Sequence, residues 1–475
     1  MTSVPPVPGE MWEQIPTAVQ QALLVVFAQY ELRLQELQQH IAELEQRLGT
    51  NSSNSSKPPS SDGPEVKRAP PKPRSGRPKG GQPGHPRSTR PLLPPTQTFV
   101  CKPAACRHCG EALAGDDPEP LRHQVLELPQ VEPIVLEYQR HRLLCPCCGI
   151  TTCAELPQGV PPGGQGPRLQ ATIAMLTGAY RLSKRQVEVL MDDLFGVPVC
   201  AATVCAVEQE VATIVDPVVA PMRQHIKDQP VNMDETSWWQ GQQRAWLWVA
   251  VTAYLTVYEL VASRGAKVAR EMLGAGYRRT VTSDRFKSYA FLALSRRQLC
   301  WAHLRRDFQA MIDRNNQGSA IGRKLLAAAD ELFKLWQKVR DGTHDRRWFA
   351  GHLRNGLRRK ISTLLVAGTA CGCAKTEATC DELVLMEQAL WTFAYREGVE
   401  PTNNAAERAL RHAVLWRRNS HGTQSATGSH FVANILSVVE TCRQQGKKVL
   451  DVLTACCEAS LHHTALPSLL PVNQA

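Results

Sequence analysis

The stretch PVNMDETSWW (230–239) closes a short apolar run with two adjacent carboxylates, Asp234 and Glu235. A later run, RRTVTSD (278–284), also ends in an aspartate, Asp284. Between these two runs lie two stretches rich in β-branched and aromatic residues and one helix-like segment. A short helix-like segment, SYAFLAL, and the run RRQLCWAH follow Asp284. This pattern predicts the element order β-β-β-α-β-α-β.

That order is the order of a ribonuclease H-like domain, in which the first and fourth strands are neighbours in the sheet. Asp234 and Asp284 are then expected to lie side by side, although they are distant in the sequence. Adjacent carboxylates repel unless a cation lies between them, and hard oxygen ligands suit Mg²⁺. Successive side chains of a strand point to opposite faces, so only one of Asp234 and Glu235 can be a ligand. Asp234 shares the face of polar Asn232, and we predict that it is the ligand.

A third acid is expected in the segment PTNNAAERALRHAVLWRRNSHG (401–422). We predict that Asn404 caps a helix beginning at Ala405. Glu407 then lies in the first turn, where the helix dipole favours a carboxylate. Four arginines follow and are predicted to bind the DNA backbone, namely Arg408, Arg411, Arg417 and Arg418. A surface helix with ion pairs is the alternative interpretation of this segment.

Sixteen cysteines are many for a protein of a reducing compartment, which indicates that some of them bind metal. Two segments, CRHCG (106–110) and CPCCG (145–149), share the pattern Cys-x-x-Cys-Gly. Four thiolates in this arrangement form a tetrahedral zinc site, and each glycine permits the tight turn behind the second ligand. We therefore predict a zinc-ribbon domain over residues 100–155 that holds structural Zn²⁺ through Cys106, Cys109, Cys145 and Cys148.

The N-terminal part of the chain has features that predict association with further copies of the chain and binding to DNA. From Leu23 to Leu48, apolar side chains recur at alternating steps of four and three, which favours a coiled coil, assigned to residues 11–49, over a single packed helix. Residues 50–99 form a Pro/Ser-rich basic arm that we expect to be disordered. In this arm Arg77 and Lys79 flank Pro78 and would suit a narrow minor groove; a solvated linker is the alternative. The net charge of +11 also favours a polyanionic partner.

The remaining chain completes a predicted multidomain α+β protein. Residues 165–225 are expected to be helical, either as a helix-turn-helix or as a plain connector. Residues 228–445 are assigned to the catalytic domain, with a mostly helical insertion at about 305–400, and residues 446–475 to a C-terminal tail. The absence of a signal peptide and of a membrane-spanning apolar window predicts a cytoplasmic, nucleoid-associated protein with no membrane partner.

The sequence resembles the insertion sequence 66 family of transposases, specifically their large catalytic subunit. The resemblance rests on NSSNSSKPPSSDG, GGQPGH, CRHCG, DET, SDRFKSY, CWAHLRRDF and TNNAAERALR. It implies a ribonuclease H-like domain with an Asp-Asp-Glu triad, matched here by Asp234, Asp284 and Glu407. CWAHLRRDF is also similar to the Cys-x-x-His that follows the last strand in several cut-and-paste transposases. This similarity implies that Cys300 and His303 support the active site.

The expected function is therefore that of a DDE-type transposase, which cleaves DNA at the element ends and joins the freed 3′-hydroxyl to target DNA. The chemistry would be two-metal phosphoryl transfer with Mg²⁺ or Mn²⁺. Expected partners are the terminal inverted repeats, the target DNA, further copies of the chain and accessory proteins of the same element. The alternatives are a ribonuclease H-like nuclease or resolvase, which cuts without joining, and a catalytically silent DNA-binding regulator.

Overall fold

The computed structural model describes residues 9–49 and 91–471. The basic arm residues Arg77 and Lys79 lie outside the described residues. Within residues 9–49 and 91–471, no helix has the length and apolar character that a membrane span requires.

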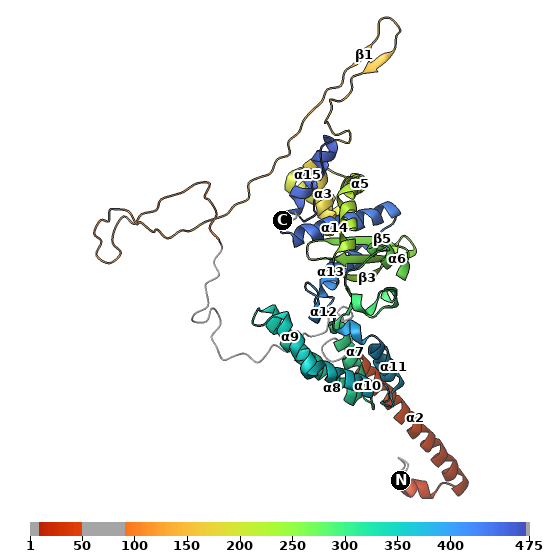
Figure 1. The fold of residues 1–475 in the computed structure, drawn as a ribbon. Helices are drawn as coiled ribbons and strands as arrows, with labels where there is room; N and C mark the ends of the chain where they lie inside the picture. The colour runs from red at the N-terminus through yellow and green to blue at the C-terminus, as the bar shows by residue number, and fades with distance from the viewer. Residues whose placement is uncertain (1–8, 50–90, 472–475) are drawn as a thin grey trace.

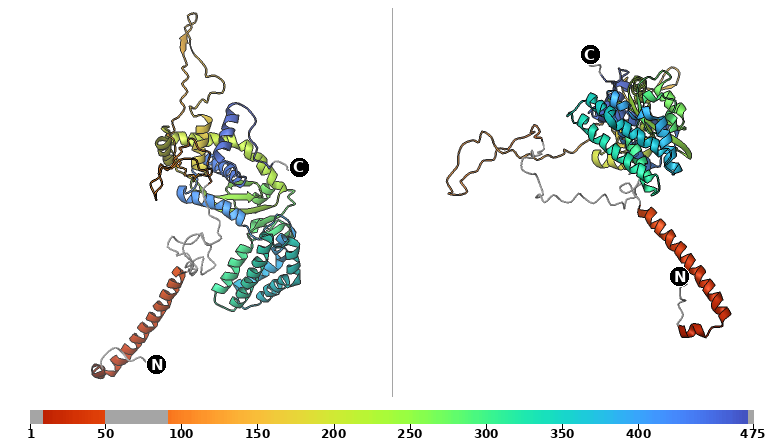
Figure 2. Two further views of the ribbon diagram at one scale, coloured as in Figure 1. Left: turned by 90° about the vertical axis from the view of Figure 1, so that its left-hand side faces the viewer. Right: turned by 60° about the horizontal axis from the view of Figure 1, so that its bottom comes forward.

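The first helices stand apart from the other helices (Figure 2). They are α1 (Gly9–Glu13) and the much longer α2 (Thr17–Gly49). The apolar residues at the predicted heptad positions include Tyr30, Leu34, Leu37 and Ile41, and each of these side chains is more than half exposed. The long helix is therefore present, and these four seam side chains are mostly exposed in this structure.

The cysteine-rich segment forms a long projection with little regular structure (Figures 1 and 2). Its one ladder pairs β1 (Arg142–Leu144) antiparallel with β2 (Thr151–Cys153). The two cysteine segments have the same turn, because Gly110 N donates to Cys106 O and Gly149 N donates to Cys145 O, both at 2.9 Å. Both glycines have positive φ angles, which glycine adopts without strain.

The central sheet has five strands, and their pairing follows from the chain order. The strands are β3 (Val231–Gln240), β4 (Gln243–Val251), β5 (Thr256–Val261), β6 (Val281–Ser283) and β7 (Arg297–Leu299). The sheet order is β5-β4-β3-β6-β7, with antiparallel pairing among the first three and parallel pairing of β3 with β6 and of β6 with β7. Helix α6 (Ala266–Leu273) connects β5 to β6.

The connection from β6 to β7 differs from the prediction. Instead of one short helix at SYAFLAL, it contains two single 3₁₀ turns, Lys287–Tyr289 and Leu294–Arg296. Buried Tyr289 and Leu292 fix this connection on the domain by packing into its core. Tertiary packing therefore decides the conformation of the segment more than its own helical pattern does.

Besides α6, six helices share one hydrophobic core with the sheet. They are α3 (Pro167–Gly178), α4 (Lys184–Phe195), α5 (Ala201–His225), α13 (Asn404–Ser420), α14 (Ala426–Gln444) and α15 (Val449–Leu461). Two predicted boundaries need correction. The helices of residues 165–225 are part of the sheet's core, and residues 446–475 contain α15, which packs against α3. Leu453, Cys456 and Cys457 of α15 are buried, so this segment is not a tail.

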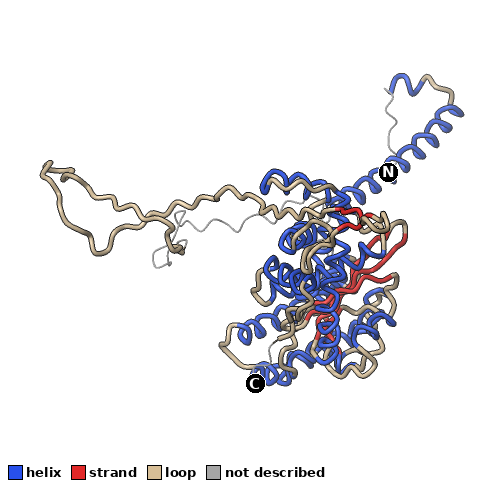
Figure 3. Tube along the Cα trace, turned by 90° about the horizontal axis from the view of Figure 1, so that it is seen from above, coloured by secondary structure: helices blue, strands red, loops and turns tan. Residues whose placement is uncertain are grey.

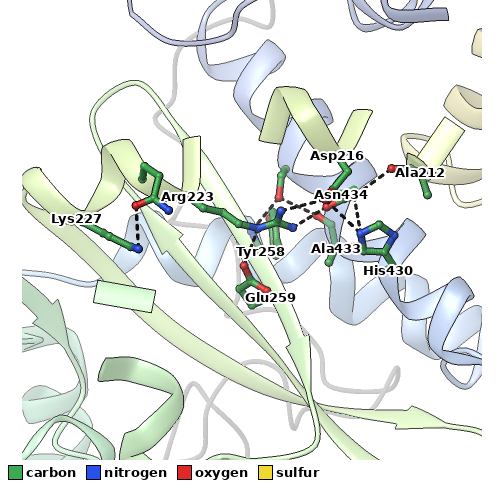
Figure 4. A network of polar contacts seen from close by, with 11 residues as sticks. Ala212, Asp216, Arg223, Lys227, Tyr258, Glu259, His430, Ala433 and Asn434 are labelled. Carbon is green, nitrogen blue, oxygen red and sulfur yellow. Dashed lines mark hydrogen bonds and ion pairs between the residues drawn. The ribbon is translucent and has the colours of Figure 1, made fainter. Parts of the chain in front are cut away.

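A polar network fastens α5 to the sheet and to α14 (Figure 4). The Arg223 guanidinium donates to Glu259 on β5 at 2.7 Å and to Asn434 on α14 at 2.7 Å, and it pairs with Asp216 at 3.1 Å. Asn434 in turn donates to Ala212 O and to Asp216. Since Arg223 of α5 bonds to strand β5 and helix α14 as well as to its own helix, α5 is an integral layer of this domain.

The insertion is a second helical body with its own core. It contains α7 (Trp301–Asp313), α8 (Ser319–Arg340), α9 (Arg346–His352), α10 (Arg358–Gly368), α11 (Ala374–Leu385) and α12 (Thr392–Tyr395). Figure 2 shows these helices gathered beside the end of the sheet, and Figure 3 shows the strands of the sheet with helices packed around them. Arg285, which follows β6, pairs with Asp307 on α7 at 3.0 Å and with Glu382 on α11. The insertion is thus tied to the sheet edge.

Candidate active site

Asp234 and Asp284 occupy corresponding positions on neighbouring parallel strands. Val231 is opposite Val281 and Asn232 is opposite Thr282, so continuing this register places Asp234 level with Asp284. Asp284 directly follows β6, and its Oδ1 accepts a hydrogen bond from Phe286 N at 2.9 Å. The two carboxylates therefore meet at the edge of the sheet where β6 ends.

Glu235 has a different environment from its neighbour Asp234. Its side chain is buried, accepts a hydrogen bond from Arg264 Nε at 2.8 Å and accepts another from the Tyr289 hydroxyl at 2.9 Å. Alternation along β3 directs these adjacent side chains to opposite faces. Glu235 is thus the anchor of a buried polar cluster.

Glu407 lies in the first turn of α13, as the helix-dipole argument predicts. Its Oε1 is 3.4 Å from His303 Nδ1 and 3.6 Å from Arg306 Nη2. Neither His303 Nδ1 nor Glu407 Oε1 has a hydrogen-bond partner in the described structure, although both atoms are shielded from solvent. Buried polar atoms are normally satisfied, so this pair of atoms is suited to an additional ligand.

The charge of Asp234 is costly at this position. Burial, followed by the nearby charges of Glu235, Asp284 and Glu407, raises the pKa of Asp234 from its usual 3.8 to about 8. Like charges that share a poorly solvated site raise each other's pKa values. The proximity of Asp284 and Glu407 is thus visible in the electrostatics of Asp234, and a bound cation would relieve the repulsion.

Buried Asn403 connects the start of α13 to the sheet, a role that the sequence interpretation missed. Its Nδ2 donates to Met233 O at 2.8 Å, its Oδ1 accepts from Asn232 Nδ2 at 3.2 Å, and its N donates to Cys300 Sγ at 3.1 Å. Contrary to the expected capping by Asn404, α13 begins at Asn404, and Asn403 in the cap position makes no side-chain cap bond. We call Asn232, Cys300 and Asn403 the latch.

Cys300 and His303 lie at this same site, at the transition from β7 to α7. Burial raises the pKa of Cys300 to about 11, so its sulfur is a neutral thiol that accepts the latch hydrogen bond. Burial lowers the pKa of His303. The ligand atoms of Cys300, His303 and Glu407 all lie within 4.8 Å of one another, which is the single such group of three found in the described residues. Cys300 therefore contacts Asn403 at the start of the helix that carries Glu407, and His303 approaches Glu407 itself.

The four arginines of α13 have two different environments. Arg408, Arg411 and Arg418 are exposed, but Arg417 is directed into the fold. Arg417 Nη1 donates to Thr236 Oγ1 at 3.1 Å, to Ser237 Oγ at 2.8 Å and to Ser237 O. Contrary to the expected DNA contact, Arg417 in this structure fastens the end of α13 to β3.

The four cysteines predicted to bind zinc lie on the two similar turns, but the structure does not bring the two pairs together. The one cluster of three potential ligands in the described residues is the group that contains Cys300. Within each turn, hydrogen bonds from Cys109 and His108 lower the pKa of Cys106, and those from Cys148 and Cys147 lower the pKa of Cys145. Zinc binds thiolates, so these turns suit the metal chemically.

Comparison with known families assigns most of the chain. Residues 163–430 match the Transposase IS66 family, and residues 103–149 match the zinc-finger binding domain of transposase IS66. Residues 10–91 match a family of unknown function. The zinc-finger match spans both cysteine pairs and supports structural Zn²⁺ there.

Among curated proteins, the chain is similar to the uncharacterized protein y4qI of Sinorhizobium fredii. The two are 27% identical over an alignment that covers 44% of this chain and 43% of that protein. The similarity thus spans less than half the length of the relative.

The raised pKa of Asp234 predicts how metal and pH affect stability. The protonated carboxyl is stabilising below pH 4, and this contribution is lost as the pH rises toward about 8. Without added divalent metal, Asp234→Asn should therefore raise the melting temperature at pH 8 and leave it nearly unchanged at pH 4. Adding Mg²⁺ at pH 8 should stabilise the wild type more than Asp234→Asn.

The matched control is Asp193→Asn, which neutralises an exposed aspartate on α4 and should behave like the wild type in both series. Equal stabilisation of the wild type and Asp234→Asn by Mg²⁺ would show that Asp234 does not bind the metal.

Proposed function

The chain belongs to the IS66 transposase family, and we propose that it is a DDE-type DNA transposase that cleaves element ends and transfers the cut strand into target DNA. The observation that supports this proposal is the level placement of Asp234 and Asp284 on neighbouring parallel strands, with Glu407 in the first turn of α13. Burial, the charge of Glu235 and the charges of Asp284 and Glu407 together raise the pKa of Asp234 to about 8. Such a cost is expected where carboxylates are placed for function.

The sheet order supports a ribonuclease H-like assignment of the catalytic domain. Three antiparallel strands are followed by two parallel ones, and the first and fourth strands are neighbours. This is the arrangement on which the sequence interpretation relied to pair Asp234 with Asp284. The domain would include α3 to α5 and α13 to α15, because these helices share its core.

The three acids fit a divalent metal by their chemistry. Oxygen ligands suit Mg²⁺ or Mn²⁺, and Glu407 Oε1 has no hydrogen-bond partner. Bound Mg²⁺ would lower the pKa of the attacking hydroxyl and stabilise the leaving oxygen. Asp234 and Asp284 would hold the metal between the two strands, and Glu407 would complete the site from α13. Cys300 and His303 would position Glu407 through the latch and the direct approach of the imidazole.

DNA would be bound by several surfaces. Arg408, Arg411 and Arg418 are exposed on α13, the helix that carries Glu407, and would contact phosphates. Arg77 and Lys79 of the basic arm would add contacts in the minor groove. We infer that the zinc-finger domain uses Cys106, Cys109, Cys145 and Cys148 as ligands and contributes to binding of the terminal inverted repeats.

Neutralising each of the three acids should abolish chemistry and retain binding. Asp234→Asn, Asp284→Asn and Glu407→Gln should each reduce cleavage and strand joining to background in Mg²⁺ on element-end DNA. All three should bind that DNA with a salt dependence like that of the wild type, because cationic side chains supply most of the affinity. The measurements are gel analysis of the products and fluorescence anisotropy of the complex.

Glu400→Gln is the matched control for Glu407→Gln. Its carboxylate accepts a hydrogen bond from Trp336 Nε1 at 3.1 Å in the insertion, so activity should persist. If the wild type cleaves DNA but does not join it, the protein is a nuclease or resolvase. If it binds DNA and neither cleaves nor joins it, the protein is a regulator. Activity of Glu407→Gln would place the third ligand elsewhere.

Zinc content tests the four thiolate ligands. Purified protein should hold about one zinc per chain. Cys106→Ser and Cys148→Ser should each lose it, because three remaining thiolates bind the metal more weakly. Atomic absorption measures the metal. Cys205→Ser, an exposed cysteine on α5, is the control and should keep full zinc content. Retention of zinc by both ligand variants would contradict the assignment.

The exposed seam of α2 supports pairing with a second copy as a coiled coil. Burying leucine-sized side chains contributes about 1.5–3 kcal/mol each, which is substantial for a seam of this length. Leu34→Glu with Leu37→Glu should lower the oligomeric mass measured by light scattering. Glu31→Gln with Glu36→Gln changes the same helix outside the seam and should retain it. An unchanged mass in the leucine variant would exclude pairing through this seam.

A further inference from the structure

Three rings on the insertion form a stacked ladder. His344, Trp348 and His352 are spaced four residues apart, which places them on one side of α9 and its preceding turn. The centroids of His344 and Trp348 are 3.9 Å apart with an interplanar angle of 6°, and those of Trp348 and His352 are 4.1 Å apart at 42°. His352 is exposed at the end of the ladder, so one of its faces can accept another ring.

Cations without carboxylate partners surround these rings. Lys338 Nζ is 5.5 Å from the centroid of Trp348, and Arg340 and Arg347 are exposed nearby in the sequence. Across residues 91–471, none of these three cations has a carboxylate within ion-pair distance. The two closest acids in sequence are used locally: Asp341 accepts hydrogen bonds from Thr343, and Asp345 caps α9 by accepting from Trp348 N. These bonds come from neutral donors and leave both carboxylates charged, but residues 338–352 still carry four Lys or Arg against two Asp, so this surface is net positive.

The ladder is held firmly to the segment that leads into α13. Arg346, between the ring residues, donates to Phe393 O and, at 3.1 Å, to Val399 O. Its guanidinium also lies 4.9 Å from the ring centroid of Trp336. Figure 1 shows α9 beside α12, and Val399 precedes the latch residue Asn403 by only a few positions. The ladder is thus attached to the segment that leads from the insertion into α13.

We propose that this ladder face, formed by Lys338, Arg340, His344, Arg347, Trp348 and His352, binds a DNA strand whose bases are unpaired. The inference rests on the proposed function, which supplies DNA with a newly cut end. Flat rings accept a stacked base of any sequence, and the cations neutralise the phosphates that flank it. A ring ladder needed only for packing would not require a surface of unpaired cations.

The test compares two DNA probes that differ in one feature. Each is a duplex carrying the terminal repeat, either blunt or with a short 3′ single-stranded overhang, and Ca²⁺ replaces Mg²⁺ so that binding is measured without cleavage. The full-length wild type should prefer the overhang. Trp348→Ala should weaken overhang binding about fivefold or more and leave blunt binding unchanged. Lys338→Ala with Arg340→Ala should reduce the salt slope by about 1.4 with the overhang probe.

Arg323→Ala with Lys324→Ala is the matched control, since it removes two exposed cations from the same helix α8 and should keep the overhang preference. If melting curves show that Trp348→Ala is unfolded, His352→Ala tests the same preference at an exposed ring. Equal losses on both probes, or an unchanged preference, would overturn the ladder proposal alone. Failure of the wild type to bind either DNA would contradict the proposed function itself.

Discussion

Holding several carboxylates close together at one poorly solvated edge of the sheet costs free energy. Much of the surrounding structure serves to keep them there. Parallel pairing of β3 with β6 places Asp234 level with Asp284, and α13 adds Glu407. No protein cation neutralises Asp234 in the described structure; burial first, and then the charges of Glu235, Asp284 and Glu407, raise its pKa to about 8. An arrangement of this cost persists only because the surrounding packing is strong enough to maintain it.

Helix α13 supplies much of that restraint, because both of its ends are attached to the same strand. Asn403 holds the beginning through Met233 O and Asn232, and Arg417 holds the end through Thr236 and Ser237. Tyr258 adds a third attachment in the middle, since its hydroxyl donates to Ala409 O at 2.9 Å. Three separated attachments fix the rotation of the helix as well as its position, and rotation determines where Glu407 points.

The sequence was informative where short-range patterns carry the signal. Alternation along 230–239 predicted the separate environments of Asp234 and Glu235, and the β-branched and aromatic runs predicted the strand order. Asp284 directly follows its strand as expected, whereas Asp234 lies within β3, which continues to Gln240. The latch was not predictable, because Asn403 bonds to backbone atoms far away in the sequence, and its local pattern resembles helix capping. Arg417 was misinterpreted for the same reason: an arginine near a helix end has no local sign of a buried partner. The packing of α15 depends on a complementary apolar surface on α3 that periodicity cannot reveal.

The independent core of the insertion has a consequence for how this domain can vary among relatives. The chain leaves the sheet at β7 and must return to place α13 beside β3. A flexible connection of that length would pay a closure entropy that grows with the logarithm of its length. In a folded connection, the folding of the connection itself offsets this entropy cost. Its own core then holds its two ends at a fixed separation. We therefore expect the insertion to behave as an interchangeable module, tolerant of altered internal helices but intolerant of any change in the spacing of its two ends.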